Sequence, residues 1–145
     1  MILIGQEIID ALKAHKFTIT GVSVSDAYSV STPKCPQLTL DELPGNSGVY
    51  LDGYPAVVRN ILTLEAYTKD MMISGSPRKK RDAAFMLIME ADTFLNETFG
   101  LTMSGNIQAV PYSDSTIFRA AANYVAYIDT RTNEILRGLN NGISY

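Results

Sequence analysis

The stretch Val57-Val58-Arg59-Asn60-Ile61-Leu62-Thr63-Leu64-Glu65-Ala66-Tyr67-Thr68 is rich in β-branched, aliphatic and aromatic residues. In an extended chain, Leu62, Leu64 and Ala66 fall on one face, and the other face carries Ile61, Thr63, Glu65 and Tyr67. The Asp52-Gly53 pair before the stretch predicts a turn. The pattern therefore predicts a long antiparallel strand that turns one face toward a core.

Further strands are expected on both sides of this stretch. Residues 37–43 alternate apolar and polar positions and end in the turn residues Pro44-Gly45-Asn46-Ser47-Gly48. Residues 17–30 predict a weak strand that leads into a loop at about 29–36. After the long stretch, 101–112 and 116–129 resemble paired strands, and 134–136 extends the pairing past a turn at 130–133.

Two helices are predicted. From about residue 4 to 16, apolar residues recur at helical spacing with charged residues on the other face. From 82 to 99 the chain has good helix formers without Pro or Gly; Ser76 is expected to cap this helix, Pro77 to suit its first position, and Gly100 to end it. Its core face is expected to comprise Ala84, Leu87, Ile88, Ala91, Phe94 and Leu95.

The order of these elements predicts an α+β fold: an antiparallel or mixed sheet of about four to five strands with two helices packed on one face. The chain has 145 residues, of which 46% are hydrophobic and 19% charged, which fits one folded domain. We expect that domain to span residues 1–137, followed by a loose tail at 138–145.

The composition argues against several classes of protein. A net charge of -3 gives no general attraction to nucleic acid. The single cysteine, Cys35, forms no internal disulfide, and a reducing compartment suits it. The apolar start of the chain is interrupted by Gly5-Gln6-Glu7, and no apolar run approaches the roughly 20 residues of a membrane span. We therefore expect a soluble, unprocessed protein.

Residues suited to catalysis or to metal binding are few. His15 is expected to lie at the end of the first helix, where the macrodipole favours it, and Cys35 is expected to be a structural thiol. The carboxylates lack the spacing of a calcium or magnesium loop, and Gly45-Asn46-Ser47-Gly48 lacks the Lys of a phosphate-binding loop. We predict no enzymatic activity, no catalytic residue, no cofactor and no metal.

The run Arg78-Lys79-Lys80-Arg81 is the feature that composition does not explain. It holds 4 of the 12 basic residues and is expected in the first turn of the second helix, where the macrodipole disfavours positive charge. One interpretation is a solvated charge run. The other is a contact with an acidic patch on a neighbouring subunit or with passing DNA phosphate.

Four segments of the chain, taken in order, resemble the tail-completion or tail-terminator (minor tail, neck) proteins of long-tailed bacteriophages. The likeness covers about residues 36–137. It is carried by Pro36-Gln37-Leu38-Thr39-Leu40-Asp41-Glu42-Leu43, by Leu62-Thr63-Leu64-Glu65-Ala66-Tyr67, by the 83–99 helix ending in Gly100-Leu101, and by Val110-Pro111, Asp114, Ile117-Phe118-Arg119 and Tyr124-Val125-Ala126-Tyr127-Ile128-Asp129. Residues 18–34 are longer and more polar than the family's pattern, and 138–145 has no counterpart in it.

The resemblance implies a virion structural protein, assembled in the host cytoplasm and located at the neck of the tail. Such proteins form homo-oligomeric rings, commonly hexamers, that cap the tail tube and join it to the head-connector or head-closure protein. Two alternatives remain open: another neck or tube component (head-closure or tail-tube protein), and a small-molecule-binding or enzymatic α+β domain.

A closed ring needs two different contact patches on each subunit. The 44–56 segment has more apolar and aromatic residues than a solvent turn requires, namely Tyr50, Leu51, Tyr54 and Pro55. The segment before Ser76 predicts a second, adaptable patch of Met71, Met72 and Ile73. We expect these two patches to meet across subunits.

Overall fold

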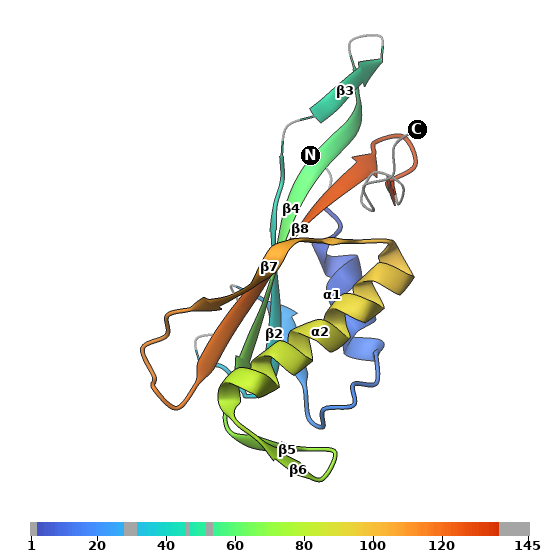
Figure 1. Cartoon of the computed structure of the whole chain (residues 1–145). Coiled ribbons are helices and arrows are strands. Elements are labelled where there is room, and N and C mark those ends of the chain that lie inside the picture. The colour runs from blue at the N-terminus through green and yellow to red at the C-terminus, as the bar shows by residue number, and fades with distance from the viewer. Residues whose placement is uncertain (1–2, 28–31, 46, 52–53, 137–145) are drawn as a thin grey trace.

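The computed structural model describes residues 3–27, 32–45, 47–51 and 54–136, with the backbone alone for 47–51 and 54–56. Eleven helices and strands follow one another in this part of the chain (Figure 1): α1 (Gly5–Ala14), β1 (Ser23–Asp26), β2 (Gln37–Leu43), β3 (Ser47–Leu51), β4 (Tyr54–Thr68), β5 (Met71–Ile73), β6 (Ser76–Arg78), α2 (Lys80–Phe99), β7 (Met103–Val110), β8 (Phe118–Asp129) and β9 (Glu134–Ile135).

The sheet is built around the long strands β4 and β8, which pair antiparallel from Val57 opposite Asp129 to Thr68 opposite Phe118. The order across the sheet is β1-β2-β4-β8-β7, with β3 added to β4 and β9 added to β8. The β1–β2 pair is parallel and the others are antiparallel, so the sheet is mixed. The predicted antiparallel strand over 57–68 is confirmed, and it begins three residues earlier, at Tyr54.

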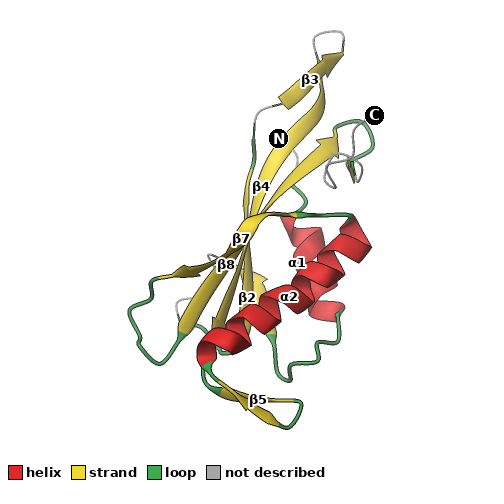
Figure 2. Ribbon diagram, viewed as in Figure 1, coloured by secondary structure: helices red, strands yellow, loops and turns green. Residues whose placement is uncertain are grey.

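One face of the sheet forms the core with both helices. Alternate residues of the central strands are buried, including Leu62 and Leu64 of β4 and Ala122 and Tyr124 of β8. Figure 2 shows both helices on the same side of the sheet. The predicted α+β class, with a mixed sheet and two helices on one face, is confirmed.

The second helix meets the core as its pattern predicts. Its expected core residues are buried, except that Phe94 is only partly buried and Ala83 joins the set. Gly100 ends the helix with a φ of 69°, a left-handed conformation that glycine adopts without strain. The hydroxyl of Tyr124 donates a hydrogen bond of 2.7 Å to Asp92, which ties the helix to β8, and burial followed by this bond raises the pKa of Tyr124.

The start of α1 is held by a carboxylate from the sheet. Glu42 of β2 accepts hydrogen bonds from the backbone N–H groups of Ile4, at 2.9 and 3.0 Å, and of Gly5, at 2.7 Å. The buried Asn60 donates to the same carboxylate at 2.8 Å and accepts from the Gly45 N–H at 3.2 Å. This network joins the first helix to β2 and β4.

Other sequence predictions hold in part. The strand over 37–43 is confirmed at the residues predicted. The pair expected at 101–112 and 116–129 is β7 and β8, which are two residues shorter at three of the four ends. Among the described residues of the weak strand predicted over 17–30, only β1 is a strand, because the preceding residues form a turn that packs Ile19 into the core. The tail predicted at 138–145 lies outside the described residues.

Candidate interaction surfaces

The segment predicted as a loop over 44–56 is largely a β-hairpin, so that part of the prediction is wrong. β3 pairs antiparallel with the start of β4, with Tyr50 opposite Pro55 and Leu51 opposite Tyr54. Figure 1 shows this hairpin projecting beyond the helices. The side chains of these four predicted interface residues, and the Asp52-Gly53 turn between the strands, lie outside what the structure describes. Their interface role stays a prediction.

The second predicted patch is a short strand rather than a loose segment. Met71–Ile73 is β5, paired with β6 in a hairpin beside α2. Because side chains alternate along a strand, Met72 is 61% exposed whereas Ile73, at 4%, belongs to the core. Met71 is half-buried against the core. The expected exposure of Ile73 is therefore wrong, and only Met72 offers a full apolar surface.

The predicted start of the second helix is also wrong. Ser76 lies in β6, and α2 begins at Lys80 without a capping hydrogen bond from the side chain of its N-cap residue, Lys79. The cap is supplied instead by Asp70, which accepts a hydrogen bond of 2.8 Å from the Lys80 N–H. Ser76 and Pro77, which the sequence analysis assigned to the start of the helix, instead form part of β6 and pair with β5.

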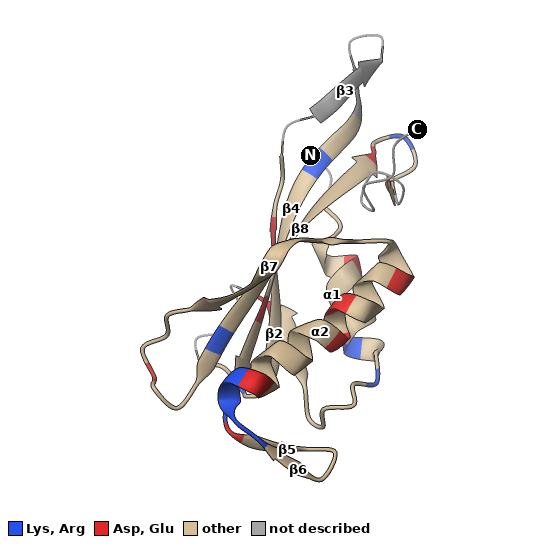
Figure 3. Cartoon of the chain, in the orientation of Figure 1, with Lys and Arg blue, Asp and Glu red and all other residues tan. Residues whose placement is uncertain are grey.

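The four basic residues gather where β6 joins α2 (Figure 3). Lys79 lies 3.9 Å from Asp70, and both side chains are largely exposed, so this pair adds little stability. The ammonium group of Lys80 donates to the carbonyl of Ser115, and the guanidinium of Arg81 lies 5.1 Å from the ring centroid of Phe85. Arg78 has no ion-pair partner among the residues that the structure describes. Positive charge therefore remains exposed at this end of α2.

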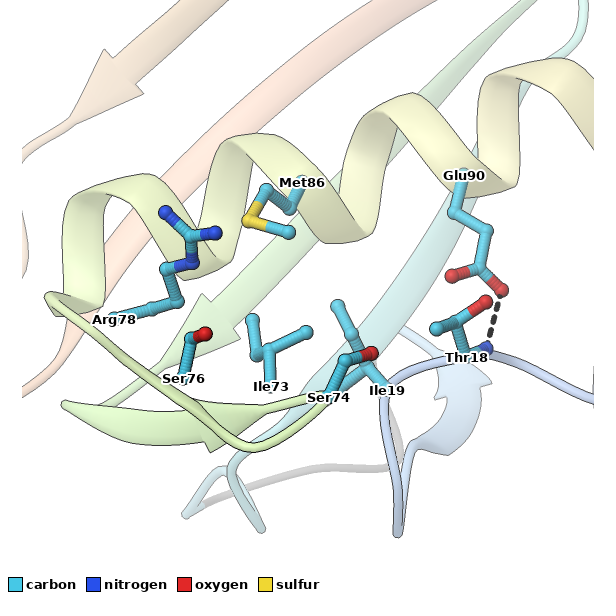
Figure 4. Close-up of a pocket in the computed structure, with 8 residues that line it drawn as sticks. All are labelled: Thr18, Ile19, Ile73, Ser74, Ser76, Arg78, Met86 and Glu90. Carbon is cyan, nitrogen blue, oxygen red and sulfur yellow. Dashed lines mark hydrogen bonds between the residues drawn. The ribbon is translucent and has the colours of Figure 1, made fainter.

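Two open hollows flank β6, and Arg78 lines both of them. The first, of about 380 Å³, lies between β6, α2 and the 18–19 turn, with Ile19, Ile73 and Met86 among its lining residues (Figure 4). The second, of about 550 Å³, is lined by Asp70, Met71, Met72, Pro77, Arg78 and Lys79. In both hollows, apolar side chains lie beside the positively charged Arg78.

His15 is a packing residue in this structure. Its ring lies 4.5 Å from the ring of Phe94 and 4.7 Å from that of Phe17, between centroids. Its Nε2 is 3.6 Å from a carboxylate oxygen of Glu90, and that oxygen also accepts a hydrogen bond of 2.8 Å from the Thr18 N–H. These contacts tie the end of α1 to the middle of α2.

Cys35 is half-buried, and burial raises the pKa of its thiol, so less of it is in the reactive thiolate form. Neither Cys35 nor His15 makes a hydrogen bond to the other or to a serine among the described residues. Within the same residues, no three His, Cys, Asp or Glu side chains lie close enough together to hold a metal ion.

The sheet face away from the helices carries an ion pair that the sequence analysis missed. The guanidinium of Arg119 donates to the carboxylate of Glu65, which is only 9% exposed, and lies 5.7 Å from the ring centroid of Tyr67. Tyr67 in turn stacks edge-on against Tyr112 at 5.6 Å. The only signal in the sequence was a charged residue on the outer face of each of two predicted strands.

No family model matches this chain, and no curated protein resembles it in sequence. Among the described residues, no helix combines the length and the apolar composition needed to cross a membrane. The basis for a function is therefore the chain's own residues and their arrangement.

Proposed function

We propose that this chain is a structural subunit of the virion of a long-tailed bacteriophage. In this role it forms a homo-oligomeric ring, hexameric by family resemblance, that caps the tail tube and joins it to the head connector. Its partners are copies of itself, the tail-tube protein and the head-connector or head-closure protein, with transient contact to passing DNA.

The observation that carries the proposal is the placement of the segments that resemble tail-completion proteins. They correspond to β2, β4, α2 and the β7–β8 pair, which are neighbours in space and make up the centre of the fold. A chance likeness of scattered short segments would not be expected to fall on one contiguous unit.

The surface features also suit assembly. The exposed Met72 lies on β5, the four basic residues follow at the junction of β6 with α2, and the β3–β4 hairpin projects from the domain. Distinct patches on one subunit are what a heterologous, ring-closing contact requires.

A second candidate, a tail-tube or head-closure component, is favoured by the projecting β3–β4 hairpin. A hairpin that extends from a domain can add its strands to the sheet of a neighbour, as repeated layers of a tube require. An enzymatic or small-molecule-binding domain has less support. The two hollows fall in the size range of ligand sites, but among the described residues no serine or threonine hydroxyl that lines them is hydrogen-bonded to a base.

The test is to locate and count the chain in purified particles. A reconstruction of the neck, together with quantitative mass spectrometry, is expected to place one ring of this chain at the head-proximal end of the tail. Copies repeated along the whole tail would identify the tube alternative instead. Complete absence from particles, or a single copy in the neck, would contradict the ring.

A loss-of-function arm completes that test. Particles made without this chain are expected to accumulate as separate heads and tails, with tails of uncontrolled length or without head attachment. Normal, infectious particles in its absence would contradict the proposed role.

A further inference from the structure

The charges of α2 run against its macrodipole. Its N-terminal end carries Lys79, Lys80 and Arg81, directly after Arg78, whereas Glu90, Asp92 and Glu97 lie in its C-terminal half and its last turn has no basic residue. A helix is stabilised by the opposite order, with each misplaced exposed charge costing a few tenths of a kcal/mol. The arrangement therefore calls for a reason other than the stability of the helix.

Within the chain, this positive end is only partly neutralised. Asp70 supplies one exposed carboxylate to Lys79, and Asp82 follows in the first turn of the helix. Arg78 is exposed and stands between the two hollows without an ion-pair partner among the described residues. The surface formed by Met71, Met72, Arg78 and Lys79, called here the basic hollow, thus offers a methionine-lined depression beside two cations, of which Lys79 is paired with the exposed Asp70.

A complementary surface would place an apolar side chain near carboxylates, and the segment that leads into α1 offers such a surface together with the first part of the helix. Leu3 is 56% exposed, and Glu7 and Asp10 are exposed at positions four and seven residues after it. Glu7 and Asp10 lie one turn apart on the same face of α1, and Leu3 lies two residues before the helix begins. Lys13 follows one turn later, so the negative charge is confined to the first part of α1. We call Leu3, Glu7 and Asp10 the acidic stripe.

The two surfaces are too far apart to meet within one chain. The basic hollow lies at the N-terminal end of α2, whereas the start of α1 is bound to Glu42 of β2. Figure 1 shows α1 away from β5 and β6. Contact between these two surfaces therefore requires two copies of the chain.

We propose that the acidic stripe of one copy of this chain docks into the basic hollow of the next. This contact rests on the proposed ring, and it is heterologous, as ring closure requires. Leu3 packs against the exposed Met72, while Glu7 and Asp10 face Arg78 and Lys79. Flexible methionine side chains suit such a contact because they adapt to the shape of the partner. DNA phosphate would use the cations but would leave the apolar hollow unfilled.

Reversal of charge tests the pairing. The variant Arg78→Glu/Lys79→Glu and the variant Glu7→Lys/Asp10→Lys are each expected to lower incorporation into particles by at least about tenfold, the effect of losing roughly 1.4 kcal/mol of contact energy. The chain with all four changes is expected to regain incorporation, because each contact is then restored with opposite signs. Lys16→Glu, an exposed change elsewhere near α1, serves as a control that should incorporate normally.

The combined variant separates the outcomes. If it stays excluded from particles while its melting temperature matches that of the parent, the pairing is wrong and the DNA reading of the basic residues gains support. If both reversed variants incorporate normally, the contact does not exist.

Cross-linking gives an independent reading. In a Cys35→Ser background, the pair Leu3→Cys and Met72→Cys is expected to yield, on oxidation of purified particles, a ladder of covalent oligomers up to the order of the ring. Each single cysteine variant should give no ladder. A ring seen in the neck reconstruction without this ladder would overturn the contact alone, whereas absence of the chain from the neck would overturn the proposed function as well.

Discussion

The two helices solve the same problem, an uncapped N-terminus, in different surroundings. Neither α1, with Ile4 at its N-cap, nor α2, with Lys79 there, receives a hydrogen bond from the side chain of its own N-cap residue. In each helix a backbone N–H group at the start donates to a carboxylate from another part of the chain: Glu42 of β2 for α1, and Asp70 for α2. The charges of α1 follow its macrodipole, with Glu7 in the first turn and Lys13 in the last, whereas those of α2 oppose it.

The two capping carboxylates differ in the number of hydrogen bonds that they accept and in their exposure. Glu42 satisfies two backbone donors and the amide of the buried Asn60. It also lies so close that a Cβ added at Gly5 would approach its Oε1 to 2.8 Å. Asp70 makes one backbone hydrogen bond, and its side chain is 64% exposed. We infer that α1 depends on polar contacts with the sheet, whereas α2 is held by its buried face and tolerates unfavourable charges at its end.

The largest expected effect comes from the buried face of α2. Leu87→Ala leaves a cavity beneath the helix and is expected to lower the free energy of unfolding by roughly 2 to 5 kcal/mol, because Leu87 is fully buried. Phe94→Ala should cost less, since Phe94 is only partly buried and rests on His15. Denaturant unfolding measures both. Equal melting of Leu87→Ala and the parent would mean that α2 is not held by this face.

The next effect concerns the cap of α1. Glu42→Ala removes the acceptor of three donors and is expected to cost roughly 2 to 3 kcal/mol, because hydrogen bonds to a charged group contribute more than neutral ones. Glu42→Gln is the matched control, since it keeps one acceptor oxygen and should cost less. Amide hydrogen exchange should show faster exchange in α1 than in α2. Uniform loss of protection in both helices would remove the proposed difference between them.

The cap of α2 should matter less. Asp70→Ala is expected to cost about 1 kcal/mol, the usual effect of losing an N-terminal capping side chain. Asp70→Asn retains an acceptor and serves as the control. A cost as large as that of Glu42→Ala, measured by the same denaturant titration, would show that the exposed cap is as important as the buried one.

The smallest effect on stability is expected from the basic residues. Replacing Arg78, Lys79, Lys80 and Arg81 by Gln should leave folding intact, or raise the free energy of unfolding by a few tenths of a kcal/mol, because positive charge opposes the helix dipole. Particle assembly should weaken nevertheless. Unchanged yields of infectious particles at low and physiological salt would return these residues to a solvated charge run.

Strongly periodic segments were predictable from the sequence. The alternation in residues 37–43 and 57–68 identified two neighbouring strands, and the last block of the chain identified β7 and β8. Gly100 was correctly expected to end α2, since a left-handed residue there favours glycine. Errors fell in short segments: Ser76 and Ile73 belong to a hairpin of two three-residue strands, which are too short to leave a recognisable alternation.

What the sequence determined by itself is the set of elements whose signal repeats locally: a helix or a long strand shows its buried face at a fixed spacing, and glycine marks its end. What only the tertiary structure decided is which polar groups meet. Glu42 reaches Ile4 across 38 residues of chain, and Tyr124 reaches Asp92 across 32. Such pairs leave no repeating pattern in the sequence, because a single hydrogen bond requires only that its two groups lie close together in the folded chain. The sequence showed only in part that the charges of α2 oppose its dipole. Where the helix begins is decided by the hydrogen bond from Lys80 to Asp70 and by the pairing of β5 with β6, and neither is visible in the sequence.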